Sequence, residues 1–288
     1  MAMYWQSDKW NKDELLSKVP QVTLAFWVIK ILATTVGETG GDALSMTLSL
    51  GYAVSSLIFI GFFCVTLAAQ VTSTRYRPFV YWAVVVATTT VGTTMSDYLD
   101  RTVGLGYIES SIMLFCAVIL VLLAWHTVTG KIEFENITTK RNEVFYWLTI
   151  LVSNTLGTAL GDFVASSAGL GFERGALVFA GLIATVAVIY LSTDVPTSLL
   201  FWAAYILTRP LGATLGDTLT KPHVEGGFDL SRITSSLIIA ALMVVGIILT
   251  SRMVRQRTDT SDNDAVGNKP HQSPLASVSL SDGGRRLF

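Results

Sequence analysis

Four aspartates occupy the same position in an internal repeat of this chain. The repeated pattern is Trp, nine residues, Gly, four residues and Asp, and its copies are Trp27-Gly37-Asp42, Trp82-Gly92-Asp97, Trp147-Gly157-Asp162 and Trp202-Gly212-Asp217. Glu38 adds a fifth carboxylate, one helical turn before Asp42 on the same helical face. Carboxylates are the ligands that hard cations such as Mg²⁺, Ca²⁺ and Mn²⁺ prefer. The pattern therefore predicts a cation or proton site made by Glu38, Asp42, Asp97, Asp162 and Asp217.

Neutral oxygen donors accompany these carboxylates in the same segments. They are Thr35, Thr90, Asn154 and Thr155. The motif-bearing segments hold no His and no paired Cys, which disfavours Cu(I) and Zn²⁺. Lys30 and Arg209 are the predicted charge partners of the acids, and five acids against two bases leave a formal charge of −3. A bound cation or protons would offset this charge, and their competition for shared carboxylates predicts exchange.

The segments that position these residues are suited to lipid. The chain has 288 residues, of which 51% are hydrophobic and 14% charged, against about 25% charged in globular domains. Each motif lies in one apolar segment and a second one follows, and each is near the ~20 residues that a spanning helix needs. The predicted spans are residues 21–46, 52–71, 78–99, 108–128, 143–165, 174–191, 196–218 and 231–251. An ionised carboxylate facing lipid is costly, so the aspartates should face the protein interior.

We expect an all-α integral membrane protein with eight transmembrane helices. An even number of spans in each repeat predicts four parallel two-helix repeats, arranged as two pseudo-symmetric halves. Lys and Arg residues gather on one side, which predicts that both termini are cytoplasmic. The expected divisions are an interfacial segment at 1–18, repeats 1 and 2 at 19–128, a cytoplasmic loop at 129–142, repeats 3 and 4 at 143–252, and a disordered cytoplasmic tail at 253–288.

Several motif positions have a second interpretation. The aspartates would also suit caps of helix starts, or outer helix ends near water. The glycines are typical both of close helix packing and of local unwinding in broken transporter helices. The tryptophans predict an aromatic belt at the headgroups, or else cation-π faces for an organic cation.

The segments Lys30-Ile31-Leu32-Ala33-Thr34-Thr35-Val36-Gly37-Glu38 and Ser96-Asp97-Tyr98-Leu99 resemble a known family. Its members are bacterial inner-membrane proteins built from four tandem copies of a two-helix, tryptophan-bearing repeat of unknown function. The resemblance covers about residues 18–252 and implies a multi-pass protein of the bacterial inner membrane. Separately, Glu38-Thr39-Gly40-Gly41-Asp42 is similar to the Glu-x-Gly-Asp motif of calcium/manganese-proton exchangers, with one extra residue and without the basic residue that usually follows.

These features predict a cation transporter, a proton-coupled exporter of Mn²⁺, Mg²⁺ or Ca²⁺. Its partners would be the divalent cation, protons and the lipid bilayer, and a homo-oligomer is compatible with the sequence. One alternative is efflux of organic cations; another is a non-transporting sensor or scaffold that recruits a partner through residues 256–288. A net charge of −1 without a basic block argues against nucleic-acid binding. No enzymatic motif or nucleotide-binding loop appears, so we expect neither an enzyme nor a cofactor.

Overall fold

The computed structural model describes residues 20–73, 75–132, 137 and 139–267. The predicted interfacial segment 1–18 lies outside these residues. The chain divides into two units, Met1–Ile248 and Leu249–Phe288. All regular secondary structure in the described residues is helical, which confirms the all-α class.

Eight long helices lie where the apolar segments were predicted. Their bounds are α2 (Leu24–Asp42), α3 (Gly51–Thr72), α4 (Pro78–Asp97), α5 (Tyr107–Thr129), α6 (Lys140–Asp162), α7 (Gly171–Ser192), α8 (Thr197–Thr220) and α9 (Arg232–Gly267). Short π-helical turns follow α2, α4 and α6 directly after the repeat aspartate, at η1 (Ala43–Thr47), η2 (Tyr98–Thr102) and η3 (Phe163–Ser167). A 3-10 helix, η4 (His223–Glu225), follows α8.

Helix α9 is longer than its apolar segment. It continues to Gly267, through residues that the sequence assigned to a disordered tail, and residues 268–288 of that tail lie outside the described chain. The physical reason is helix cooperativity, because the unfavourable nucleus has already formed in the apolar part and each further residue adds a hydrogen bond.

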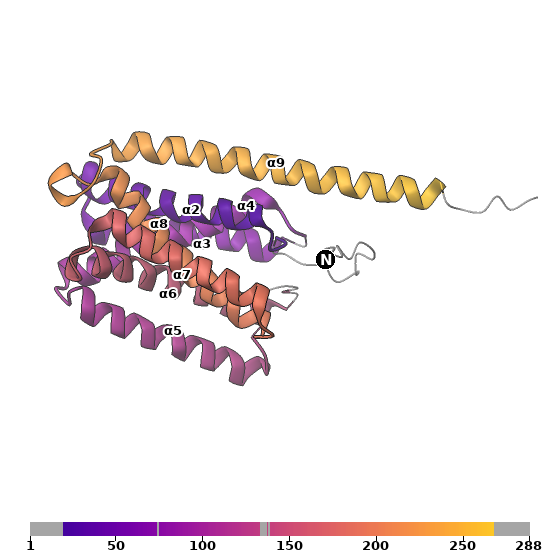
Figure 1. The fold of residues 1–288 in the computed structure, drawn as a ribbon, viewed down its shortest axis with the longest axis horizontal. Helices are drawn as coiled ribbons and strands as arrows, with labels where there is room; N and C mark the ends of the chain where they lie inside the picture. Colours follow the sequence, from indigo (N-terminus) through magenta and orange to yellow (C-terminus); the bar gives the residue numbers. More distant parts are fainter. Residues whose placement is uncertain (1–19, 74, 133–136, 138, 268–288) are drawn as a thin grey trace, which may run out of the picture. The chain divides into compact units, whose positions relative to one another are not determined.

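Helices α2, α4, α6 and α8 form an inner ring within the first unit. Each packs on two others, in the order α2, α4, α6, α8 and back to α2. The outer helices α3, α5 and α7 pack on α4, α6 and α8, so the second helix of each repeat contacts the first helix of the next repeat (Figure 1). Helix α9 completes the circle on α2, where the Ser236 hydroxyl donates to Thr39 Oγ1 at 2.8 Å and Gly246 lies against Ile29.

The repeat glycines hold the inner helices close together. Each lies against the residue three places before the glycine of the next inner helix: Gly37 against Thr89, Gly92 against Asn154, Gly157 against Arg209, and Gly212 against Thr34. One turn later Gly41 lies against Thr93 and Gly216 against Glu38, so neighbouring inner helices run parallel. The helices are continuous through these glycines. Close packing is therefore their role, and the interpretation as points of unwinding is wrong.

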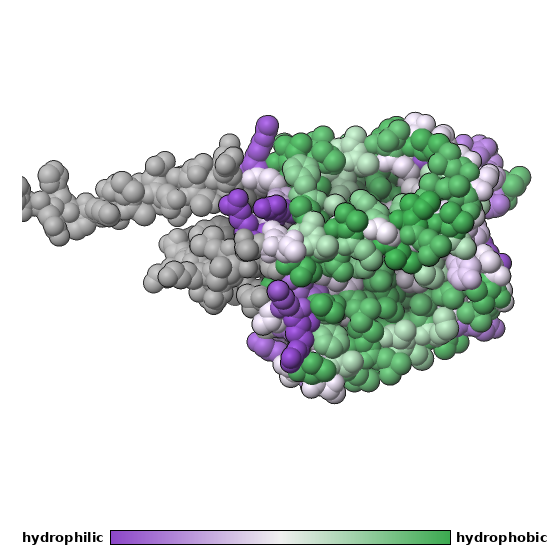
Figure 2. Space-filling view, turned by 180° about the vertical axis from the view of Figure 1, so that it is seen from behind, coloured by the Kyte–Doolittle hydropathy of each residue, from purple (hydrophilic) through white to green (hydrophobic). Residues whose placement is uncertain are grey.

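The outer surface has the character of a membrane-spanning bundle. Six helical segments of the described chain are long and apolar enough to cross a membrane, namely α3, α4 with η2, α5, α6 with η3, α7, and α9 to Met253. In α3, α5, α7 and α9 only 17 to 22% of the apolar window is buried in protein, against 72 and 67% in the inner helices α4 and α6. Figure 2 shows broad hydrophobic surface with hydrophilic residues near its two ends. The chain is thus a multi-pass α-helical membrane protein.

The repeat tryptophans lie in an aromatic core at one end of the inner ring, here called the tryptophan end. Trp82, Trp147 and Trp202 are buried, whereas Trp27 is partly exposed. They pack against Phe26, Tyr81, Tyr146 and Phe201. The predicted headgroup belt is therefore wrong for Trp82, Trp147 and Trp202. Neighbouring helices cover the rings that a single helix would present to lipid headgroups.

Candidate functional site

The four repeat aspartates lie at the opposite end of the inner ring, here called the aspartate end. Asp42, Asp97 and Asp162 are the last residues of their α-helices, and Asp217 lies about one turn before the end of α8. All four are at most 2% exposed. Within the described chain, the side chains of Asp42, Asp97 and Asp162 make no capping hydrogen bond to the turns that follow. The interpretation of these residues as helix caps is therefore wrong.

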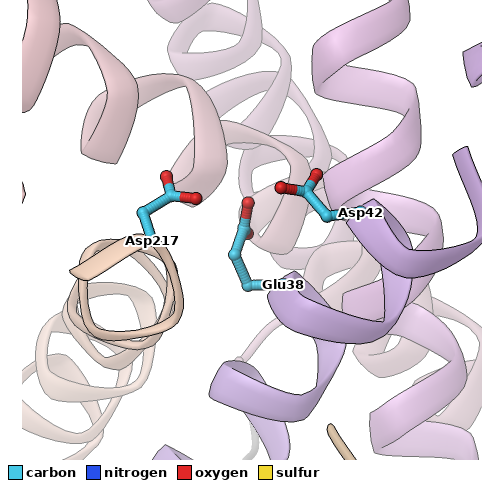
Figure 3. A group of neighbouring side chains, drawn as sticks. All are labelled: Glu38, Asp42 and Asp217. Carbon is cyan, nitrogen blue, oxygen red and sulfur yellow. The ribbon is translucent and has the colours of Figure 1, made fainter. Parts of the chain in front are cut away.

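Three buried carboxylates converge between α2 and α8. Oxygen atoms of Glu38, Asp42 and Asp217 lie within 4.8 Å of one another. Figure 3 shows the two side chains of α2 and the one of α8 directed toward a common point. We call these three residues the carboxylate cluster. Of the five predicted acids, the described structure brings these three together as a group with metal-binding geometry.

Asp97 and Asp162 form a separate pair. Arg101 joins them, with Nε 3.2 Å from an Asp97 oxygen and Nη2 3.6 Å from an Asp162 oxygen. The five predicted carboxylates thus occupy two neighbouring places at the aspartate end, which interact electrostatically.

Basic side chains occupy both places. Lys221 Nζ lies 3.3 Å from Asp42 Oδ2 and 3.3 Å from Asp217 Oδ1, and Arg232 Nε lies 3.7 Å from Asp42 Oδ2. The predicted count of two bases against five acids is incomplete, because Arg101, Lys221 and Arg232 were assigned to outer connections and in fact contact the acids. The available signal was the spacing of four residues between Asp97 and Arg101, and between Asp217 and Lys221.

The surroundings of Lys221 favour its protonated, positively charged form. Lys221 follows the last residue of α8 and is 4% exposed. Burial lowers the pKa of Lys221, but the carboxylates of Asp217 and Asp42 outweigh burial, and the pKa is raised well above its ordinary value. The ammonium therefore acts as a tethered cation between two carboxylates.

Arg209 lies inside the ring beside the carboxylate cluster. Its Nη2 is 3.0 Å from Glu38 Oε2, and it also donates to Thr93 Oγ1 at 2.5 Å and to Thr158 Oγ1 at 2.6 Å. Glu38, Thr93 and Thr158 each follow a repeat glycine, so one guanidinium reaches the same position of three repeats. Arg209 is 0% exposed. The prediction that it partners an acid is met by its ion pair with Glu38.

Lys30 has no such partner. It is 0% exposed, and its Nζ lies 4.1 Å from the centroid of the Tyr205 ring. Nζ makes no hydrogen bond to any described residue. Its predicted role as a charge partner of the acids is therefore wrong, because seven residues separate it from the repeat glycine and place it toward the tryptophan end.

The predicted neutral ligands also lie apart from the carboxylate cluster. The hydroxyls of Thr35, Thr90 and Thr155 donate to carbonyls one turn earlier in their own helices, at 2.9, 3.1 and 3.0 Å. Asn154 Nδ2 donates to Thr88 Oγ1 at 3.0 Å. The threonines precede the aspartates by seven residues, which is about 10 Å along a helix. They belong to the packing between inner helices rather than to one ligand shell with the acids.

Comparison with known proteins agrees with the repeat architecture seen in the fold. The chain is a multi-pass helical membrane protein built from four tandem repeats. The model of a family described as "Repeat of Unknown Function (DUF347)" matches residues 25–76, 80–131, 145–195 and 200–256, and the chain belongs to this family. The comparison with curated proteins and that with solved structures each gave no significant match. The family confirms the predicted tandem repeats and adds no support for the similarity to cation/proton exchangers.

Proposed function

We propose that the protein is a membrane transporter of cations, and that it exports a hard divalent metal in exchange for protons. The observation that carries the proposal is the carboxylate cluster, in which oxygens of Glu38, Asp42 and Asp217 lie within 4.8 Å of one another. Asp42 Oδ1 has no hydrogen-bond partner among the described residues, although Asp42 is 1% exposed. Mn²⁺, Mg²⁺ and Ca²⁺ are the ions that an all-oxygen site of this kind suits.

Charge balance supports exchange at this cluster. Buried carboxylates left without a positive partner are strongly destabilising. The cluster must therefore always hold a cation, which can be the Lys221 ammonium, a metal ion or protons. A metal ion that enters between Asp42 and Asp217 displaces Lys221, and the ammonium or protons return when the metal leaves. Arg209 stays with Glu38 and fixes the inner side of the site.

The proposed topology follows from the distribution of basic residues. Eight helices cross the membrane, with α2 and α8 enclosed by the other helices, and the four parallel repeats form two pseudo-symmetric halves. Arg75, Arg77, Lys131, Lys140 and Arg141 follow or precede helix ends on the side of the tryptophans, which supports cytoplasmic termini in a bacterial inner membrane. The carboxylate cluster then lies toward the outside, where an exporter releases its ion. The proposal includes no enzymatic step and no cofactor.

Flux into proteoliposomes tests the proposal. Vesicles containing a metal-sensitive and a pH-sensitive dye are exposed to Mn²⁺, Mg²⁺, Ca²⁺ or a quaternary amine. We expect divalent-metal entry with opposite proton movement, reduced to the protein-free background in Asp217→Asn. Asp162→Asn is the matched control, because Asp162 holds the same repeat position outside the cluster, and it should retain measurable flux. Absence of flux with every ion would overturn the proposal and favour the scaffold; flux of the amine alone would favour organic-cation efflux.

Removing the tethered cation should strengthen metal binding. In Lys221→Met, Asp42 and Asp217 lose the ammonium that competes with the metal. We expect Mn²⁺ to bind tighter by on the order of tenfold, about 1.4 kcal/mol, in calorimetric titrations of the purified protein. Lys140→Met, with an exposed lysine at the start of α6, is the control and should bind like wild type. Unchanged or weaker binding in Lys221→Met would contradict the role of Lys221 as a competitor.

A further inference from the structure

The inner ring holds a second polar site, on the tryptophan side of Glu38. Successive turns place equivalent repeat positions in layers. The residues seven places before the repeat glycines are Lys30, Val85, Ile150 and Tyr205, and those three places before them are Thr34, Thr89, Asn154 and Arg209. All eight are at most 1% exposed. The two layers lie about 6 Å apart along the helices, since they differ by one turn.

Hydrogen-bond donors without acceptors gather in these two layers. Lys30 Nζ, the Tyr205 hydroxyl, and Arg209 Nε and Nη1 have no hydrogen-bond partner in the described chain. Trp202 Nε1, whose ring lies 5.6 Å from that of Tyr205, has none either. Buried hydrogen-bond donors normally have acceptors, and each buried donor without an acceptor lowers the stability of the fold. Asn154 Oδ1 and the Tyr205 hydroxyl oxygen are acceptors of these layers without a partner in the described chain, and as neutral groups they leave a positive charge uncompensated.

The charges in these layers are positive. Arg209 is paired with Glu38 through Nη2 alone, so its other nitrogens remain available. No described acid forms an ion pair with Lys30, whose Nζ makes no hydrogen bond to a described residue and lies over the Tyr205 ring. The pair Glu38–Arg209 is neutral in sum, so a Lys30 ammonium would be the one charge of these layers without a counter-ion among the described residues. A single negative charge would balance it.

We propose that a small monovalent anion binds between Lys30 and Arg209, on the axis of the inner ring. Its ligands are the Lys30 ammonium, the Tyr205 hydroxyl and the free guanidinium nitrogens of Arg209. Balance with a Lys30 ammonium selects one negative charge, and the close helix contacts at Gly157 and Gly212 disfavour a large anion. The anion site shares no carboxylate with the proposed cation site, and Arg209 borders both.

Equilibrium binding of radiolabelled chloride tests the proposal. The purified protein is kept in gluconate at constant ionic strength and without divalent metal, and nitrate, formate and sulfate are used as competitors. We expect saturable binding of one chloride per chain, displaced by nitrate or formate but not by sulfate. Loss of a charge-assisted hydrogen bond in Lys30→Met should weaken binding at least about tenfold.

Three further variants make the result specific. Lys30→Arg keeps the charge and should retain binding, which separates loss of the ligand from misfolding. Lys221→Met removes a lysine at the aspartate end and should bind chloride like wild type. Asp217→Asn should also bind chloride while losing metal flux, so failure of one proposal is distinguishable from failure of the other. Absence of saturable binding in wild type, or equal affinity in a folded Lys30→Met variant, would overturn the anion site.

Discussion

Replacing Arg209 by methionine is expected to lower the free energy of unfolding by about 3–5 kcal/mol. Glu38 is 3% exposed, and its Oε2 lies 3.0 Å from Arg209 Nη2. Methionine keeps the aliphatic part of the side chain, which packs against Gly157, but leaves the Glu38 carboxylate buried without its guanidinium. Unfolding of the protein in detergent micelles, followed by tryptophan fluorescence, measures the change.

The double variant Glu38→Gln, Arg209→Met separates charge from packing. Removing both charges takes away the penalty of a buried unpaired carboxylate, so most of the lost stability should return. The neutral glutamine can still accept the hydrogen bond that Thr93 Oγ1 donates to Glu38. If the double variant is as unstable as Arg209→Met, lost packing rather than the ion pair is the cause.

Adding one methyl group at Gly212 should destabilise the protein by about 1–3 kcal/mol. A Cβ at this position would overlap with the Thr34 side chain and lie 2.9 Å from the Thr34 backbone carbon. A rotamer change of Thr34 cannot relieve the contact with its backbone carbon, so α8 and α2 must move apart. The same unfolding measurement on Gly212→Ala tests this expectation.

Gly181→Ala is the matched control and should change stability in the opposite direction. Gly181 is an exposed residue of the outer helix α7, with nothing within 4 Å of the position of a Cβ. Alanine is favoured over glycine in a helix by roughly 0.5–1 kcal/mol. A loss of stability of similar size in both variants would show that the contact with Thr34 does not determine the result.

The helices could be predicted because their lengths are set by lipid. Eight apolar segments near the required length, together with a repeat that keeps its register, locate α2 to α8 and the start of α9 within a few residues. The burial of the aspartates also follows from sequence, since carboxylates facing lipid are costly. These inferences depend on local composition and spacing alone.

The partners of the aspartates could not be predicted in the same way. Arg101, Lys221 and Arg232 follow or precede apolar segments and so resemble residues of solvent-exposed connections. The π-helical turn η2 and the end of α8 return Arg101 and Lys221 to the ring, and the spacing of four residues from Asp97 and Asp217 is the sequence signal for this return. Which acids meet depends on residues that not every repeat has, namely Glu38 in the first and a basic residue four places after the aspartate in the second and fourth, Arg101 and Lys221.

The circular order of the helices has a consequence for biosynthesis. Contacts that close the ring join the two ends of the chain: Arg209 and Glu38 are 171 residues apart, and Lys221 and Asp42 are 179 residues apart. A nascent chain therefore exposes the charged side of α2 until its last repeat has been made. A product truncated before Arg209 lacks the counter-ions Arg209 and Lys221 of Glu38 and Asp42, so proteases that recognise unpaired buried charge would distinguish it from the finished protein.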